Sequence, residues 1–87
     1  MTNTIEQISS EIKILLNEIL ASQEVFDYDT PLKKIGVSSL IFVKFIIAIE
    51  EKYDIEFDDQ LLTINSFDNI SEIAKYIISN VTPYSEV

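Results

Sequence analysis

The sequence predicts an all-α domain, and three observations support this prediction. Apolar residues recur at three- and four-residue intervals in long segments, which is the spacing of one face of an α-helix. The 87 residues include one Gly and two Pro, too few for a loop-dominated scaffold, and are 47% hydrophobic, too apolar for a disordered chain. This length fits one small domain, so we expect residues 1–87 to form a single folded unit.

The first helix is predicted over residues 4–20, followed by a long loop over residues 21–37. Thr4 and Gln7 match a capping box, in which each side chain bonds a backbone N–H that the helix leaves free. The loop has no helical period and contains several turn-forming residues, including the only Gly. A connection of this length needs apolar anchors, for which the candidates are Val25, Phe26, Leu32 and Ile35.

Three further helices are predicted, over residues 39–53, 60–64 and 70–79. The segment 60–64 has only one turn of helical pattern. Asn69 followed by Glu72 is a cap signal for the last helix. The polar residues 81–87 are expected to form a frayed tail.

The helix predicted over residues 39–53 has two apolar faces when its residues are placed about 100° apart. The wide face is assigned to the core and comprises Phe42, Phe45, Ile46, Ile49 and Tyr53. The narrow face comprises Leu40, Val43 and Ile47, and Lys44, Glu50 and Glu51 flank it with charge. The favoured interpretation is an exposed patch for a partner. The alternative is a central helix that is buried on all sides.

Composition excludes several functions. The absence of Cys and His removes disulfides, thiol nucleophiles and the usual catalytic imidazole, so we do not expect an enzyme. The net charge of −9 would repel nucleic acid and favours basic protein partners. The longest apolar stretch, residues 40–49, is about half the length of a membrane span. Residues 1–11 are acidic and polar where a signal peptide would have a basic start and an apolar run, so we do not expect one. A cytoplasmic protein is expected.

Ser39 is a candidate for binding phosphate. It stands at the predicted start of a helix, where free backbone N–H groups and the helix dipole favour an anion. The alternative is that Ser38 and Ser39 serve only as helix caps. The acidic run over residues 50–59, with net charge −5, lacks the Gly and terminal Glu of a calcium loop, and no metal site is predicted.

The run LKKIGVSSL over residues 32–40 resembles the signature of the acyl carrier protein and peptidyl carrier protein family. In that signature a Leu-Gly pair is followed by a variable residue and then by Asp-Ser-Leu. Here Ile35-Gly36 stands for the pair and Ser38-Ser39-Leu40 for the triplet, so Ser38 replaces the family's Asp but can still cap a helix. Similarity continues at Val43, Glu50, Glu51, Tyr53 and residues 55–57 and 73–77.

The resemblance implies a four-helix bundle with a long first loop and a short third helix. It also implies that 4′-phosphopantetheine, donated by coenzyme A, is esterified to Ser39 and holds pathway intermediates as thioesters. The expected partners are a phosphopantetheinyl transferase, an acyl- or aminoacyl-loading ligase and downstream synthase enzymes. We expect them to dock on a monomer through the narrow face and its acidic rim, that is, through Leu40, Val43, Ile47, Glu50 and Glu51.

Ser38, Lys44 and the Phe-rich second helix favour polyketide, nonribosomal peptide or related specialised biosynthesis. Two alternatives remain. One is a housekeeping fatty-acid carrier. The other is a helical adaptor or pseudo-carrier that binds a partner through the second helix without a prosthetic group.

Overall fold

Three α-helices and two short 3₁₀ helices make up the regular structure of the described residues. The computed structural model describes residues 4–21 and 26–81. In chain order the elements are α1 (Thr4–Leu20), η1 (Leu32–Ile35), α2 (Ser39–Tyr53), η2 (Asp59–Leu61) and α3 (Ile70–Val81). No described helix is long and apolar enough to cross a lipid bilayer.

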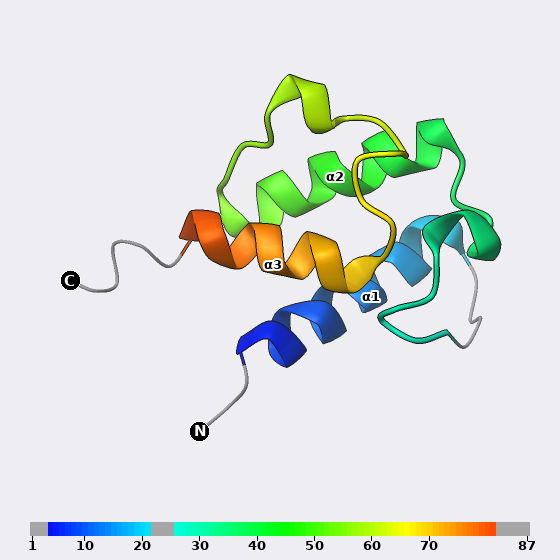
Figure 1. Ribbon diagram of the computed structural model, residues 1–87, viewed down its shortest axis with the longest axis horizontal. Coiled ribbons are helices and arrows are strands. Elements are labelled where there is room, and N and C mark those ends of the chain that lie inside the picture. The colour runs from blue at the N-terminus through cyan, green and yellow to red at the C-terminus, as the bar shows by residue number, and fades with distance from the viewer. Residues whose placement is uncertain (1–3, 22–25, 82–87) are drawn as a thin grey trace.

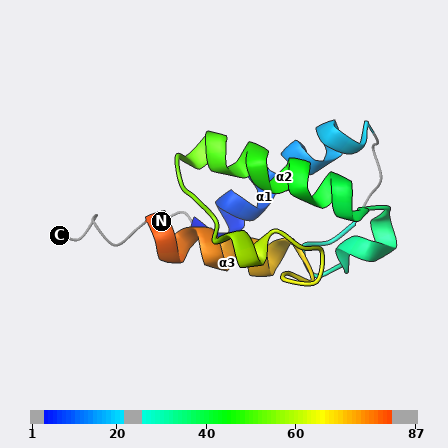
Figure 2. The ribbon, with the colours of Figure 1, turned by 90° about the horizontal axis from the view of Figure 1, so that it is seen from above.

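Helix α1 lies against both other α-helices. It runs in one direction along the molecule, and α2 and α3 both run back in the opposite direction (Figures 1 and 2). Its buried positions, Ile8, Ile12 and Leu16, are spaced by four residues and form one stripe facing the core. The side chain of Thr4 lies outside the described residues, and so does the predicted capping box. The predicted tail over residues 81–87 begins too early, because Val81 belongs to α3, and residues 82–87 lie outside the described residues.

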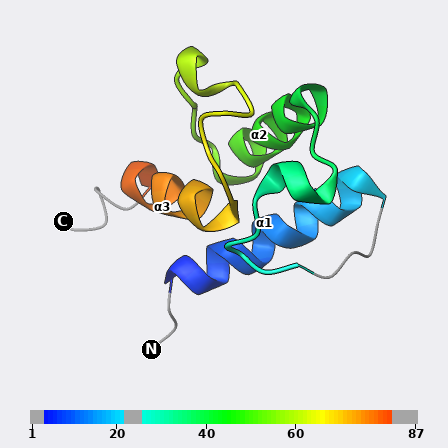
Figure 3. The same ribbon diagram turned by 45° about the vertical axis from the view of Figure 1, so that its right-hand side comes forward.

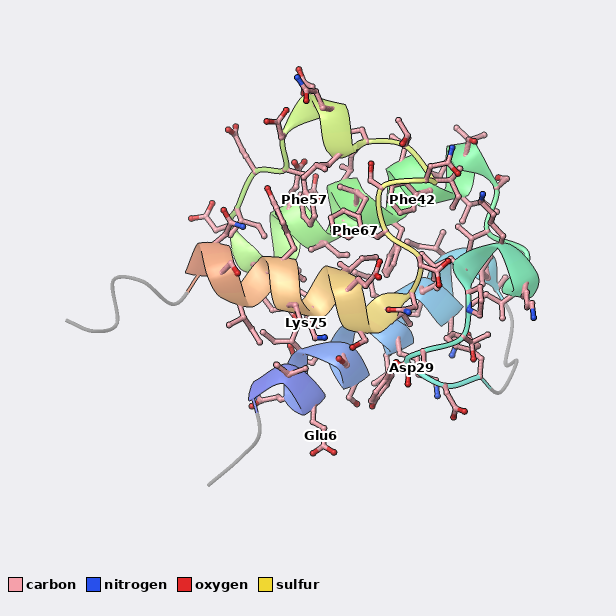
Figure 4. All side chains as sticks on the ribbon, in the orientation of Figure 1. Glu6, Asp29, Phe42, Phe57, Phe67 and Lys75 are labelled. Carbon is pink, nitrogen blue, oxygen red and sulfur yellow. The ribbon has the colours of Figure 1, made fainter. Side chains whose placement is uncertain are left out.

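The core combines the wide face of α2 with the inner faces of α1 and α3. Phe42, Phe45, Ile46 and Ile49 of α2 are fully buried, as are Ile73 and Ile77 of α3. Four aromatic rings link α2 to α3. The ring centroid of Phe67 lies 6.4 Å from that of Phe42 and 5.6 Å from that of Tyr76, and the ring of Phe57 stacks on that of Tyr76 with 4.7 Å between the centroids. The rings of Phe42, Phe57 and Phe67 gather between these two helices (Figure 4).

The short helix predicted over residues 60–64 is a 3₁₀ helix over Asp59–Leu61, so its predicted bounds change. Only the 3₁₀ turn η2 forms there, with the Asp58 side chain accepting a hydrogen bond from Gln60 N at 3.0 Å. A separate turn follows at once, in which Ser66 N donates to Thr63 O at 3.0 Å. One turn of helix fixes several residues for very few hydrogen bonds, so a segment this short does not propagate. The described chain therefore has three α-helices, and the 3₁₀ helix η2 stands where the short third helix of the predicted four-helix bundle was expected.

Two other predicted boundaries change. Helix α3 ends at Val81 rather than at residue 79. The predicted loop over residues 21–37 contains the 3₁₀ helix η1. Two of its predicted anchors, Phe26 and Leu32, are buried, and Ile35 packs partly against the core. The fourth, Val25, lies outside the described residues.

Candidate functional site

Helix α2 begins at a tight junction with η1. Gly36 ends η1 with φ +89°, in the left-handed region that favours glycine, and its N–H donates to Leu32 O. Val37 N also donates to Leu32 O, at 3.3 Å, and Val37 is buried. These contacts turn the chain directly into α2, and Figure 3 shows η1 beside the start of that helix.

Two long-range bonds hold η1 in place. Leu32 N donates to Asp68 O at 2.8 Å, and Lys33 Nζ donates to Asn65 Oδ1 at 2.7 Å. Both partners belong to the segment between η2 and α3. The sequence pattern did not identify Asn65 or Asp68, because hydrophobic periodicity carries no signal for a bond to a distant loop. The start of α2 is thus positioned by residues about thirty positions further along the chain.

Ser38 is the N-cap of α2. Its backbone is extended, with φ −83° and ψ 173°, and its hydroxyl accepts a hydrogen bond from Ile41 N at 3.2 Å. The prediction that Ser38 can cap the helix is confirmed. Because Ser38 provides the cap, the neighbouring Ser39 is not needed for that role.

Ser39 is the first helical residue of α2 and is exposed. At this position the backbone N–H has no acceptor within the helix, and the positive end of the helix dipole faces solvent. An oxygen carrying a phosphoryl group would therefore be placed in a favourable field. The hydroxyl is open to an approaching enzyme, and a covalent phosphate fits this position.

The two faces of α2 differ in burial as predicted. On the narrow face Leu40 is 66% exposed and Ile47 is 45% exposed, whereas Val43 is half-buried. The alternative prediction, that α2 is buried on all sides, is therefore wrong. The apolar strip of α2, defined as Leu40, Val43 and Ile47, begins next to Ser39 and runs along the outside of the helix.

The two acidic residues predicted at the rim of this strip have different surroundings. Glu51 is exposed. Glu50 is half-buried, and its Oε2 accepts a hydrogen bond from Phe57 N at 2.7 Å. Its carboxylate thus holds the segment that leaves α2 against the helix. Asp54 adopts a left-handed conformation with φ 56°, and its N–H donates to Glu50 O, which ends α2.

Tyr53, predicted as a core residue, is only half-buried because its hydroxyl reaches across to α1. It donates a hydrogen bond to Glu11 Oε1 at 2.5 Å. Burial raises the pKa of Tyr53 well above its usual range, and the hydrogen bond and the negative charge of Glu11 raise it further. This contact joins the end of α2 to α1 at a distance of 42 residues in sequence, so no local pattern predicted it.

Comparison with known families gives a match over most of the chain. Residues 10–77 match the family model described as a phosphopantetheine attachment site. The matched range contains η1, all of α2 and most of α3. A search of curated proteins gave no match to the chain. Among the described residues, no group of three or more acidic side chains is placed to hold a metal ion.

Proposed function

The chain belongs to the phosphopantetheine attachment family, whose members carry covalently bound 4′-phosphopantetheine and are carriers rather than enzymes, and from that premise we propose that Ser39 is the attachment residue. The supporting observation is the division of roles at the start of α2, where Ser38 caps the helix and Ser39 is exposed beside it. A serine that is not needed to cap the helix keeps its hydroxyl available for modification.

The attached arm supplies a terminal thiol that holds cargo as a thioester. The chain's own residues then have three tasks. Ser39 fixes the point of attachment, the start of α2 stabilises the phosphate charge, and the apolar strip of α2 offers partners a contact next to that point. A tethered cargo reacts at a high effective concentration, so the carrier needs no catalytic side chain.

We assign the protein to specialised biosynthesis, as a discrete carrier of acyl or aminoacyl groups for polyketide, nonribosomal peptide or related products. Ser38 at the position of the family's Asp, together with Lys44 on the outer face of α2, supports this choice over a housekeeping fatty-acid carrier. The partners would be a phosphopantetheinyl transferase, a loading ligase and synthase enzymes, acting on a cytoplasmic monomer. Loading assays with adenylating ligases and with acyl transferases separate aminoacyl from acyl cargo.

A second candidate function is a helical adaptor that carries no prosthetic group. The exposure of Leu40 and Ile47 is the observation in its favour, since an adaptor also needs an apolar contact surface. Intact mass spectrometry after incubation with coenzyme A and a broad-specificity transferase separates the two. A carrier gains the mass of one phosphopantetheinyl group, and the Ser39→Ala variant does not. An unchanged mass for the folded wild-type chain favours the adaptor.

A further inference from the structure

The chain segment that contains Ser39 has a charge of the opposite sign to that of the protein as a whole. Residues 30–49 contain Lys33, Lys34 and Lys44 and no acidic residue, so this segment carries +3 within a chain of net charge −9. The rest of the chain therefore carries −12, that is, −9 minus +3. All three lysines are exposed. Lys33 and Lys34 of η1 and Lys44 of α2 thus place three exposed positive charges on the two elements that flank Ser39, which we call the cationic end of α2. The exposed Asp68, whose backbone O accepts a hydrogen bond from Leu32 N, belongs to the segment between η2 and α3 and is not part of residues 30–49.

The acidic residues next to α2 lie at its other end. Residues 50–59 contain six acids and one Lys, and except for the half-buried Glu50 these charged residues are exposed. At about 1.5 Å per helical residue, Lys44 and Glu51 are separated by roughly 10 Å along α2, and Ser39 and Glu51 by about 18 Å. The Debye length at physiological salt is about 8 Å. The positive charges at the start of α2 and the negative charges at its end are therefore largely screened from each other, and an approaching protein meets them as separate charges.

One exposed line of side chains connects the two ends. Leu40, Lys44, Ile47 and Glu51 follow one another at spacings of four, three and four residues, which places them on one side of α2, and all four are exposed. Along this line the apolar Leu40 is followed by the positive charge of Lys44, and the apolar Ile47 is followed by the negative charge of Glu51. A surface of this kind distinguishes the two possible directions in which a partner could lie along the helix.

We propose that enzymes acting on the Ser39 arm bind α2 through a two-signed surface, with carboxylates beside the entrance for the arm and basic residues further away. This inference rests on the proposed attachment at Ser39. It differs from what the net charge alone predicts, which is a uniformly basic partner. Carboxylates facing Lys34 and Lys44 pair with the cationic end, and basic groups facing Glu51 pair with the acidic end. The apolar side chains of Leu40 and Ile47 supply the contact between them.

A phosphopantetheinyl transferase provides the test, because it must bring its active site to Ser39 and so covers this surface. The transferase to use is the one that modifies the wild-type chain fastest in a panel of purified enzymes. Lys44→Glu is compared with Lys75→Glu, an exposed lysine on α3 (Figure 4). Each variant changes the net charge from −9 by the same two units, so their difference isolates the position of the charge. Circular dichroism first establishes that both variants are folded.

We expect Lys44→Glu to lower kcat/KM for modification by about tenfold at low salt, and Lys75→Glu to leave it within about twofold of wild type. High salt should reduce the difference in kcat/KM between the two lysine variants. Glu51→Lys should also lower kcat/KM. An equal effect of the two lysine variants, or a faster reaction of Lys44→Glu, overturns the inference and indicates a uniformly basic partner. A wild-type chain that no transferase modifies contradicts the proposed attachment instead.

Discussion

The two faces of α2 allow a direct comparison of one residue in the core with a neighbour on the surface. Ile49 is completely buried, whereas Ile47 is 45% exposed. Replacing Ile49 by Glu removes about 1.5 to 3 kcal/mol of apolar burial and adds the cost of a buried carboxyl group without a partner, about 3 kcal/mol or more. An 87-residue domain has a total stability of about 4 to 13 kcal/mol. We therefore expect Ile49→Glu to be largely unfolded or severely destabilised.

The same change at Ile47 should be tolerated. Since about half of this side chain already lies in water, the loss of burial is about 1 kcal/mol, which lowers the melting temperature by about 4 to 8 °C. Thermal unfolding followed by circular dichroism measures both variants. If Ile47→Glu unfolds as completely as Ile49→Glu, the strip is part of the core and the reasoning is refuted. If the strip contacts partners, folded Ile47→Glu should lose about 2 kcal/mol of docking energy, about thirtyfold in kcat/KM for modification.

Three further predictions concern contacts of α2. Ser38→Ala should lose about 1 kcal/mol of unfolding free energy in a denaturant titration, and Ser38→Asp close to none, because Asp also caps a helix. A Ser38→Ala variant as stable as wild type would show that the cap bond contributes nothing. Glu50→Ala leaves the Phe57 N–H without its acceptor and should cost about 1 to 2 kcal/mol, whereas Glu51→Ala should stay within about 0.5 kcal/mol of wild type; similar values for both would contradict the role given to Glu50. Because the pKa of the Tyr53 hydroxyl is raised in the folded chain, the unfolded chain loses this proton at a lower pH. The difference in unfolding free energy between wild type and Tyr53→Phe should therefore shrink as pH rises above about 10. A difference that is constant between about pH 8 and pH 10.5 would count against the buried hydrogen bond.

Long helices were predictable because each of their turns repeats the same signal. Helices α1 and α2 span the residues at which apolar spacing predicts them, Thr4–Leu20 and Ser39–Tyr53. The cap at the start of α3 was also readable, since Glu72 N donates to Asn69 Oδ1 at 2.9 Å, as the Asn-to-Glu spacing predicts. Glu72 Oε1 in turn accepts from Asp68 N at 2.7 Å, one residue earlier than an ideal capping box would place it.

Short elements and distant contacts were not predictable in the same way. The 3₁₀ helices η1 and η2 have too few residues to show a period, so η1 was predicted as part of a loop and the bounds predicted for the helix at η2 were wrong. The bond between Tyr53 and Glu11 joins positions that have no shared pattern.

The candidate site was predictable in its residue types but not in its electrostatics. Ser38 and Ser39 were located by a local motif, and the exposed strip by helical periodicity. The hydrogen bond that the Glu50 carboxylate accepts from Phe57 N depends on how the chain folds back after α2, which only the structure shows. The charge of +3 over residues 30–49 can be counted in the sequence, but the structure is needed to show that all three lysines are exposed, and Figure 1 shows that η1 and the start of α2 lie at the same end of the molecule.

The central claim is that Ser39, and not its neighbour Ser38, carries phosphopantetheine. Peptide mapping by tandem mass spectrometry after treatment with coenzyme A and a transferase tests this claim most directly, because both hydroxyls lie in one peptide and fragmentation distinguishes them. The proposed function predicts that the modification maps only to Ser39 in the wild-type chain, persists in Ser38→Ala and is absent from folded Ser39→Ala. Modification of Ser38, or of folded Ser39→Ala, would contradict it.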